Sequence, residues 1–130
     1  MTEQGAGQPY LDLDRVAAVL AGLRPTWTAL GVRAGQLTWR DAQASWPQPI
    51  LTDRSRIAEP ESLGITLTTD RGNEALVVIW RGGWADFDVL AGGEVTTNAP
   101  NLASVTDCVE LVETAVNLIS GGASPERPGT

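Results

Sequence analysis

The sequence contains no histidine and no lysine, and all nine of its basic residues are arginine. Without histidine the chain lacks the commonest general base, the partner that activates serine and cysteine nucleophiles, and the usual zinc ligand. Without lysine it lacks the side chain that forms Schiff bases and binds phosphate in P-loops. These absences exclude most enzyme classes, and we expect a protein that is not an enzyme and needs no cofactor or metal.

Cysteine and long apolar runs are also scarce. The single cysteine, Cys108, cannot form an internal disulfide. The apolar run Ala75–Trp80 is far shorter than the roughly 20 residues that cross a bilayer. The N-terminus shows no basic region followed by an apolar one, which a signal peptide would require. We therefore expect a cytoplasmic protein that does not bind membranes.

Negative charge dominates the composition, with a formal net charge of −7 and an isoelectric point near 4.4. Such a chain repels phosphate backbones, so nucleic-acid binding is disfavoured and a basic protein partner is favoured. Acidity also serves solubility alone. The charge is therefore compatible with a basic partner without requiring one.

Composition predicts a single folded domain at residues 10–120. Apolar residues make up 42% of the chain and charged residues 19%, and a chain of this length can bury one core without disulfides. Residues 1–9 and 121–130 have linker composition, and we expect both to be disordered tails.

Two segments have apolar residues at helical spacing. The first, near the N-terminus, contains Pro25, which predicts either a Pro-kinked helix or two short helices meeting at Arg24. The second follows Ser104, which forms a capping-box pattern with Asp107. Cys108 lies in this second stripe, so we expect it in the core and not as a reactive thiol. The stripes are Leu13, Val16, Leu20, Leu23, Trp27 and Leu30, then Val105, Cys108, Val109, Val112, Val116 and Ile119.

Alternating apolar residues predict strands between these helices. The segments are Val32–Asp41, Leu63–Thr69, Ala75–Trp80, Trp84–Ala91 and a shorter Glu94–Thr97 that adds a fifth strand. Because the strands are grouped, the sequence predicts an α+β fold: an antiparallel sheet of four to five strands, with the N-terminal helix and the C-terminal helix packed on one face. Ala75–Trp80 is apolar on both faces and should lie mid-sheet.

The segment Gln43–Ser62 contains three prolines and follows neither period. Within it, Ile50–Ile57 is the one stretch that could form a short edge strand. Trp46 stands near the start of this loop among prolines. The loop either binds a partner or packs on the sheet as a lid, and we favour the lid.

Residues 80–84 read WRGGW. The glycine pair suits a two-residue hairpin turn flanked by Arg81 and Trp84. Trp80 is expected in the core. Trp84 either packs under a loop or stays exposed as a contact for a partner, where tryptophan is enriched.

Asp86 and Asp88 alternate with apolar residues, so both should point away from the core. Together with Asp70, Glu74 and Glu94 they predict an acidic surface on the open side of the sheet. Converging carboxylates could instead hold a hard cation, but a solvated strand face is the commoner reason for this pattern. The candidate partner-binding residues are Asp86, Asp88, Trp84, Arg81 and Trp46.

The run "LVVIWRGGWADFDVLAGGEVT" resembles small immunity proteins of bacterial polymorphic toxin systems, in particular the TriTu type. The matching residues are Val77, Trp80, Gly83, Ala85, Asp86, Phe87 and Val89, with a further match at Ala29–Arg33. The resemblance implies a leading helix, an aliphatic strand ending in tryptophan and a glycine turn, and a closing helix. It also implies a non-catalytic antidote that covers the active surface of a cognate toxin, here expected to be a basic toxin domain.

A second hypothesis is a small acidic secretion chaperone. Such proteins are also α+β and dimeric, and they hold an unfolded export substrate along apolar grooves. The sequence leaves the oligomeric state open between monomer and homodimer.

Overall fold

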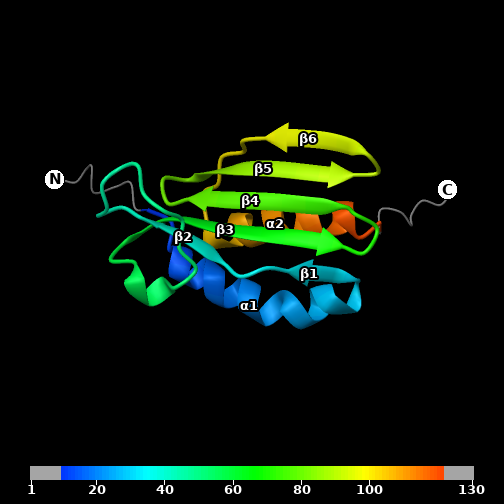
Figure 1. The fold of residues 1–130 in the computed structure, drawn as a ribbon, viewed down its shortest axis with the longest axis horizontal. Coiled ribbons are helices and arrows are strands. Elements are labelled where there is room, and N and C mark those ends of the chain that lie inside the picture. Colours follow the sequence, from blue (N-terminus) through cyan, green and yellow to red (C-terminus); the bar gives the residue numbers. More distant parts are fainter. Residues whose placement is uncertain (1–9, 122–130) are drawn as a thin grey trace.

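A computed structural model describes residues 10–121, and Figure 1 shows the fold. These residues form two α-helices, six strands and a short 3-10 helix. The elements are α1 (Leu13–Ala29), β1 (Val32–Ala34), β2 (Thr38–Asp41), the 3-10 helix Arg54–Arg56, β3 (Pro60–Thr69), β4 (Glu74–Trp80), β5 (Trp84–Ala91), β6 (Glu94–Asn98) and α2 (Val105–Ile119). The predicted α+β class is confirmed, with one strand more than expected. The predicted tails lie outside the described residues, apart from Gly121.

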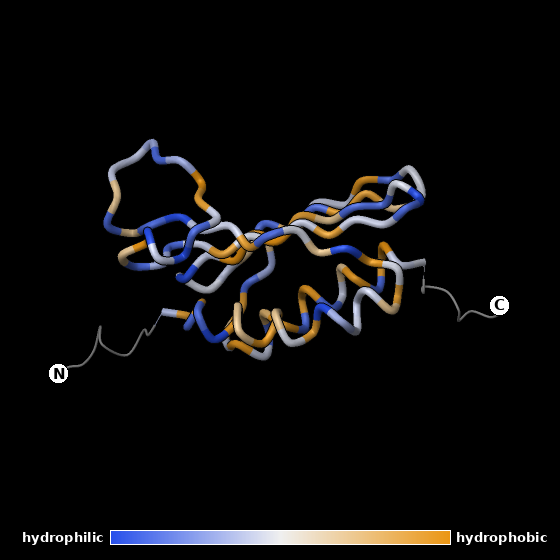
Figure 2. The backbone as a smooth tube through the Cα atoms, turned by 60° about the horizontal axis from the view of Figure 1, so that its bottom comes forward, coloured by the Kyte–Doolittle hydropathy of each residue, from blue (hydrophilic) through white to orange (hydrophobic). Residues whose placement is uncertain are grey.

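The sheet is antiparallel throughout, in the order β1-β3-β4-β5-β6. β2 also pairs with β3: β2 pairs with residues 60–64 of β3, and β1 pairs with residues 67–69. β4 lies in the middle, as its apolar sequence predicts. Both helices lie on the same side of the sheet (Figures 1 and 2), which confirms the predicted packing on one face. Neither helix within residues 10–121 has the length and apolarity needed to cross a bilayer.

The N-terminal helix α1 is a single helix that contains Pro25, so the alternative of two short helices is wrong. It begins at Asp12, whose side chain accepts a hydrogen bond from the Arg15 backbone N–H. In its apolar stripe Leu23 is half-buried and Leu30 is 51% exposed, and the buried members are Leu13, Val16, Leu20 and Trp27. Tertiary contacts hold the helix through the proline, because packing and not propensity supplies most helix stability.

The single strand predicted at 32–41 is divided into β1 and β2. Between them Gly35 donates its N–H to the Thr66 carbonyl at 2.8 Å. Arg24 on α1 donates to the carbonyls of Ala34 and Gly35 at 2.8 and 2.7 Å. The side chain of Arg24 therefore binds backbone carbonyls that a continuous strand would direct away from the sheet edge.

One hydrophobic core lies between the sheet and the helices. Alternate strand residues enter it, including Ala85, Phe87 and Val89 of β5, as predicted. Trp27 is fully buried there, and its indole N–H donates to Glu113 on α2 at 3.3 Å. The core also takes Ile57 from the long loop. Burial of these side chains is the main stabilising contribution.

The C-terminal helix α2 begins with the expected cap. The Ser104 hydroxyl accepts the Asp107 N–H at 3.0 Å, and the Asp107 carboxylate accepts the Ala103 N–H at 2.8 Å. Cys108 is fully buried, and burial raises the pKa of its thiol to about 11. The predicted core role of this cysteine is confirmed.

Ser104→Ala should lower the free energy of unfolding by about 1 kcal/mol, because the Asp107 N–H loses its acceptor at the helix start. Urea unfolding followed by circular dichroism measures this loss. Ser104→Asp, which restores an acceptor, serves as the control and should keep most of the stability. Equal stability of the alanine variant and the wild type would show that the cap contributes nothing.

Candidate functional site

The sheet side opposite the helices carries a mixture of apolar and acidic residues. Side chains alternate along a strand, so the neighbours of the buried residues of β4 and β5 must point to this side. We call this surface the open face. Its central residues are Leu76, Val78 and Trp80 of β4, Trp84, Asp86, Asp88 and Leu90 of β5, and Val95 and Thr97 of β6.

Trp80 and Trp84 lie directly opposite each other across the β4–β5 hairpin. Their rings stack with centroids 5.5 Å apart and an angle of 14° between the planes. The predicted two-residue turn is wrong: residues 81–83 form the turn, with Gly83 at φ 105° donating to the Trp80 carbonyl at 3.0 Å. With this three-residue turn, Trp80 lies half-buried on the open face. The expectation that Trp80 lies in the core is therefore wrong.

Two further contacts fix the ring of Trp80. The Arg40 guanidinium lies over it, 4.9 Å from the ring centroid, and donates to the Ser62 hydroxyl at 3.1 Å. The indole N–H of Trp80 donates to the Asp86 carboxylate at 3.1 Å. Arg40, Trp80 and Trp84 therefore form a stacked row across the sheet, and Trp84 ends the row with 40% of its surface exposed.

Asp86 and Asp88 point to the open face, as predicted. Asp88 accepts a hydrogen bond from the Thr97 hydroxyl at 2.9 Å. Glu74 shares this face, but Glu94 belongs to the opposite set of β6 side chains, and Asp70 pairs with Arg33. The predicted acidic surface is therefore smaller than expected. In the part of the chain that the structure describes, no three metal-binding side chains gather.

A shallow hollow of about 290 Å³ lies on the open face beside Asp88. Leu76, Leu90 and Val95 give it an apolar lining, and Glu74 and Asp88 lie at the same hollow. Leu76 and Val95 are 42% and 71% exposed. These three apolar residues were not among the predicted site residues. The sequence of β4, which is apolar on both faces, indicated that some apolar side chains would remain on the open face.

Arg81 has partners within the protein. Its guanidinium forms ion pairs with Glu59 at 2.6 Å and Glu61 at 3.0 Å, and it lies 3.9 Å from the centroid of the Tyr10 ring. Only 18% of the Arg81 side chain is exposed. Arg81 therefore attaches the hairpin to the start of β3 and is not part of the open face.

Part of the long loop, residues 42–59, rises at one end of the sheet on the side opposite the helices (Figure 2), and Arg54 in the same loop contacts α1. The stretch 50–57, for which the sequence left a short edge strand open, does not form one: Leu51 forms an isolated bridge with Trp39, and a 3-10 helix follows. Trp46 and Ile50 are 59% and 51% exposed. The loop therefore presents apolar side chains to solvent, and the expected packing of Trp46 as a lid is not observed.

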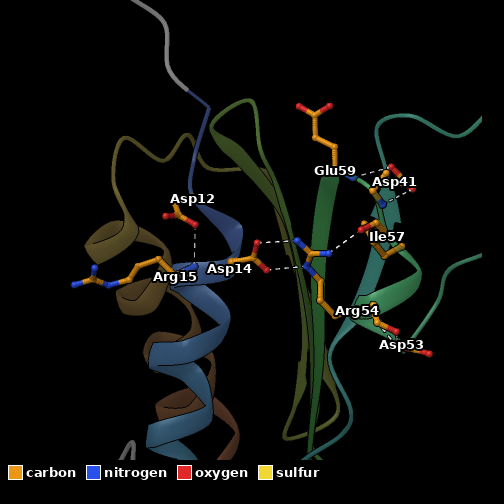
Figure 3. Close-up of polar contacts among 10 residues, drawn as sticks. Asp12, Asp14, Arg15, Asp41, Asp53, Arg54, Ile57 and Glu59 are labelled. Atoms are coloured by element: carbon orange, nitrogen blue, oxygen red, sulfur yellow. Dashed lines mark hydrogen bonds and ion pairs between the residues drawn. The ribbon is translucent and has the colours of Figure 1, made fainter.

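Asp41 at the end of β2 closes the base of this loop. Its carboxylate accepts the N–H groups of Gln43, Ala58 and Glu59 at 2.9, 2.8 and 3.1 Å. Figure 3 shows the contact with Glu59. These hydrogen bonds, first those from Ala58 and Gln43, hold the pKa of Asp41 below its ordinary value.

Arg54 attaches the far end of the loop to α1 (Figure 3). It donates to both carboxylate oxygens of Asp14 at 2.7 and 2.8 Å and to the Ile57 carbonyl at 2.8 Å. The guanidinium also lies 5.4 Å from the centroid of the Trp39 ring. The hydrogen bonds from Arg54 lower the pKa of Asp14. Both ends of the loop are therefore fixed to the domain.

Comparison with known proteins adds no further assignment. No protein-family model matches the chain, and no curated protein or solved structure is significantly similar to it. The candidate site is therefore defined by its geometry, which joins the stacked tryptophans, Asp86, Asp88 and the apolar hollow on one surface.

Acid should release the loop at its base. The pKa values of Asp14, Asp41 and Glu59 are lowered in the folded state, so their stabilising contribution is present above an ordinary carboxyl pKa of about 4 and is lost as pH falls through the folded values. Amide chemical shifts of Ala58, measured by NMR from about pH 5 to about pH 2, should follow this release.

The matched control is Asp41→Asn, in which a neutral amide replaces the titrating group. The pH-dependent shift of the Ala58 amide should disappear in this variant, and its exchange with solvent at neutral pH should accelerate. A wild-type amide that titrates with the ordinary aspartate pKa of about 3.9 would contradict this account of the loop base.

Proposed function

We propose that this protein is a non-catalytic protein-binding module, an immunity-type antidote that covers a basic toxin domain with its open face. The observation that carries the proposal is the exposure of Trp84 at the end of a fixed aromatic row. Binding hot spots are enriched in tryptophan at the centre of an interface. A ring already held by Trp80 loses little conformational freedom when a partner covers it.

The charges beside Trp84 support a basic partner. Asp86 and Asp88 lie on the same strand face, within a chain of net charge −7. Complementary charges raise the association rate and exclude acidic competitors. An arginine or lysine of the partner could contact the ring of Trp84 as Arg40 contacts Trp80.

The chemistry of the described side chains supports a non-catalytic role. The chain has no histidine, and the thiol of Cys108 is buried with its pKa raised to about 11. A buried thiol that stays protonated at neutral pH is a poor nucleophile. The resemblance of residues 77–89 to TriTu-type immunity proteins is the reason for proposing a toxin as the partner.

A second candidate function is that of a secretion chaperone, and the apolar hollow favours it. Leu76, Leu90 and Val95 offer a surface on which an apolar segment of an export substrate could lie. The two functions predict different partners: an immunity protein binds a folded toxin domain, whereas a chaperone binds an unfolded segment.

Trp84→Ala should weaken binding to a toxin domain encoded beside this gene by about 30-fold, as expected for a tryptophan hot spot worth about 2 kcal/mol. Calorimetry with purified proteins measures the change. Leu118→Ala is the matched control, because Leu118 is 41% exposed on α2, on the other side of the protein. Equal affinity of the Trp84 variant and the wild type would disprove the choice of surface.

Asp88→Arg should slow association with the same toxin and flatten its dependence on salt, because a charge that attracts the basic partner is reversed. Stopped-flow fluorescence measures the rate. Glu110→Arg makes the same change in net charge on α2, where Glu110 is exposed, and should have a smaller effect. Equal effects of the two variants would mean that only total charge matters.

A further inference from the structure

The two edges of the sheet differ in how their backbone is covered. At the β1–β2 edge, Arg24 binds the carbonyls of Ala34 and Gly35. Beside it, Trp39 and Leu51 exchange two backbone hydrogen bonds of 2.7 and 3.0 Å. Helix and loop therefore close this edge against a further strand.

The opposite edge, β6, is open. Among residues 10–121 β6 pairs only with β5, and all of its residues are exposed. The turn at 92–93 has positive φ at both glycines, 62° and 84°, and a two-residue turn makes Ala91 and Glu94 a hydrogen-bonded pair. By alternation, Val95 and Thr97 direct their N–H and C=O groups away from β5, toward solvent.

β6 also lacks the features that usually protect an edge strand. Its sequence, EVTTN, contains no lysine and no proline, and its only charge is Glu94 at the first position. Val95, Thr96 and Thr97 are β-branched residues, which favour strand pairing. An unprotected edge of this kind is a template for another strand.

We propose that β6 pairs with β6 of a second copy, antiparallel about a two-fold axis at Thr96. In this register Val95 lies opposite Thr97 of the second copy, and Thr97 opposite its Val95, so the outward N–H and C=O groups meet in four hydrogen bonds. Glu94 lies opposite Asn98 of the second copy, so no like charges are directly opposed. The two sheets join edge to edge, with both open faces on the same side.

The second copy fits this edge better than an unrelated strand, because the pattern of the edge is self-complementary about Thr96. Because the β1–β2 edge is closed, each copy offers one open sheet edge, and the dimer occupies it. The assembly therefore stops at two copies and does not grow into a filament. The net charge of −7 on each copy opposes association, so salt should strengthen the dimer. This inference is independent of the proposed function.

Thr97→Pro tests the pairing. It removes an N–H that points outward and leaves the hydrogen bonds to β5 intact, a substitution that edge strands tolerate. Each dimer loses two hydrogen bonds, so sedimentation velocity should show dimerisation weakened about tenfold or more. Thr97→Val is the control: it loses the hydroxyl contact with Asp88 but keeps the N–H, and it should dimerise like the wild type.

Circular dichroism must show that both variants are folded. A wild-type protein that stays monomeric at every concentration and at high salt would overturn the proposal. The same conclusion follows if the folded proline variant dimerises as strongly as the wild type, which would place the interface elsewhere.

Thr96→Cys tests the register. At the two-fold axis the two introduced thiols belong to a non-hydrogen-bonded pair, with Cα atoms about 4.5 Å apart, inside the disulfide range of about 4.4–6.8 Å. Mild oxidation should therefore give a covalent dimer on a non-reducing gel. Cys108 is fully buried and should not compete.

Asn98→Cys is the matched control, because the two introduced thiols would lie four residues apart along the paired strands, about 13 Å, and should not cross-link. Equal cross-linking of both variants, or of neither, would overturn the register.

Discussion

Everything in this fold depends on one constraint: both helices cover the same side of a single sheet. Alternate residues of each strand then enter one core, and their neighbours face away from it. On β4 the constraint buries Ala75, Val77 and Ile79 and leaves Leu76 at 42% exposure on the other side. The protein covers part of this uncovered apolar surface by stacking Trp80 between Arg40 and Trp84. What stays exposed is the surface to which we assign partner binding.

The sequence predicts those features that depend on neighbouring residues. The stripes of both helices, the cap at Ser104, and the inward Phe87 with the outward Asp86 and Asp88 all follow from local periodicity. The apolar hollow could also have been predicted from the sequence. A strand that is apolar on both faces, in a domain with two helices on one side, must leave one apolar face uncovered.

The hairpin turn between β4 and β5 could not be predicted from its glycine pair alone. The Leu102 N–H donates to the Gly83 carbonyl at 2.8 Å, and this contact from a distant segment accompanies the three-residue turn. Because a shift of one residue moves a side chain to the other face, that difference decided the position of Trp80.

The long loop could not be predicted for a different reason. Its order comes from residues far apart in the chain: Arg54 and Asp14 are 40 positions apart, and Arg81 and Glu59 are 22 apart. Arginine and acidic residues are spread along the whole sequence, so nothing local indicates which of them form pairs. The ion pairs with Glu59 and Glu61 explain why Arg81, a candidate contact by sequence, is held within the domain. Trp46, another candidate contact, stays exposed at 59%.

The stacked indoles of Trp80 and Trp84 have an optical consequence. Two identical chromophores held 5.5 Å apart at a fixed small angle couple their electronic transitions, and the coupled pair has an ultraviolet dichroism that separate rings lack. The protein thus carries an intrinsic spectroscopic reporter at the end of the sheet where its aromatic row meets solvent.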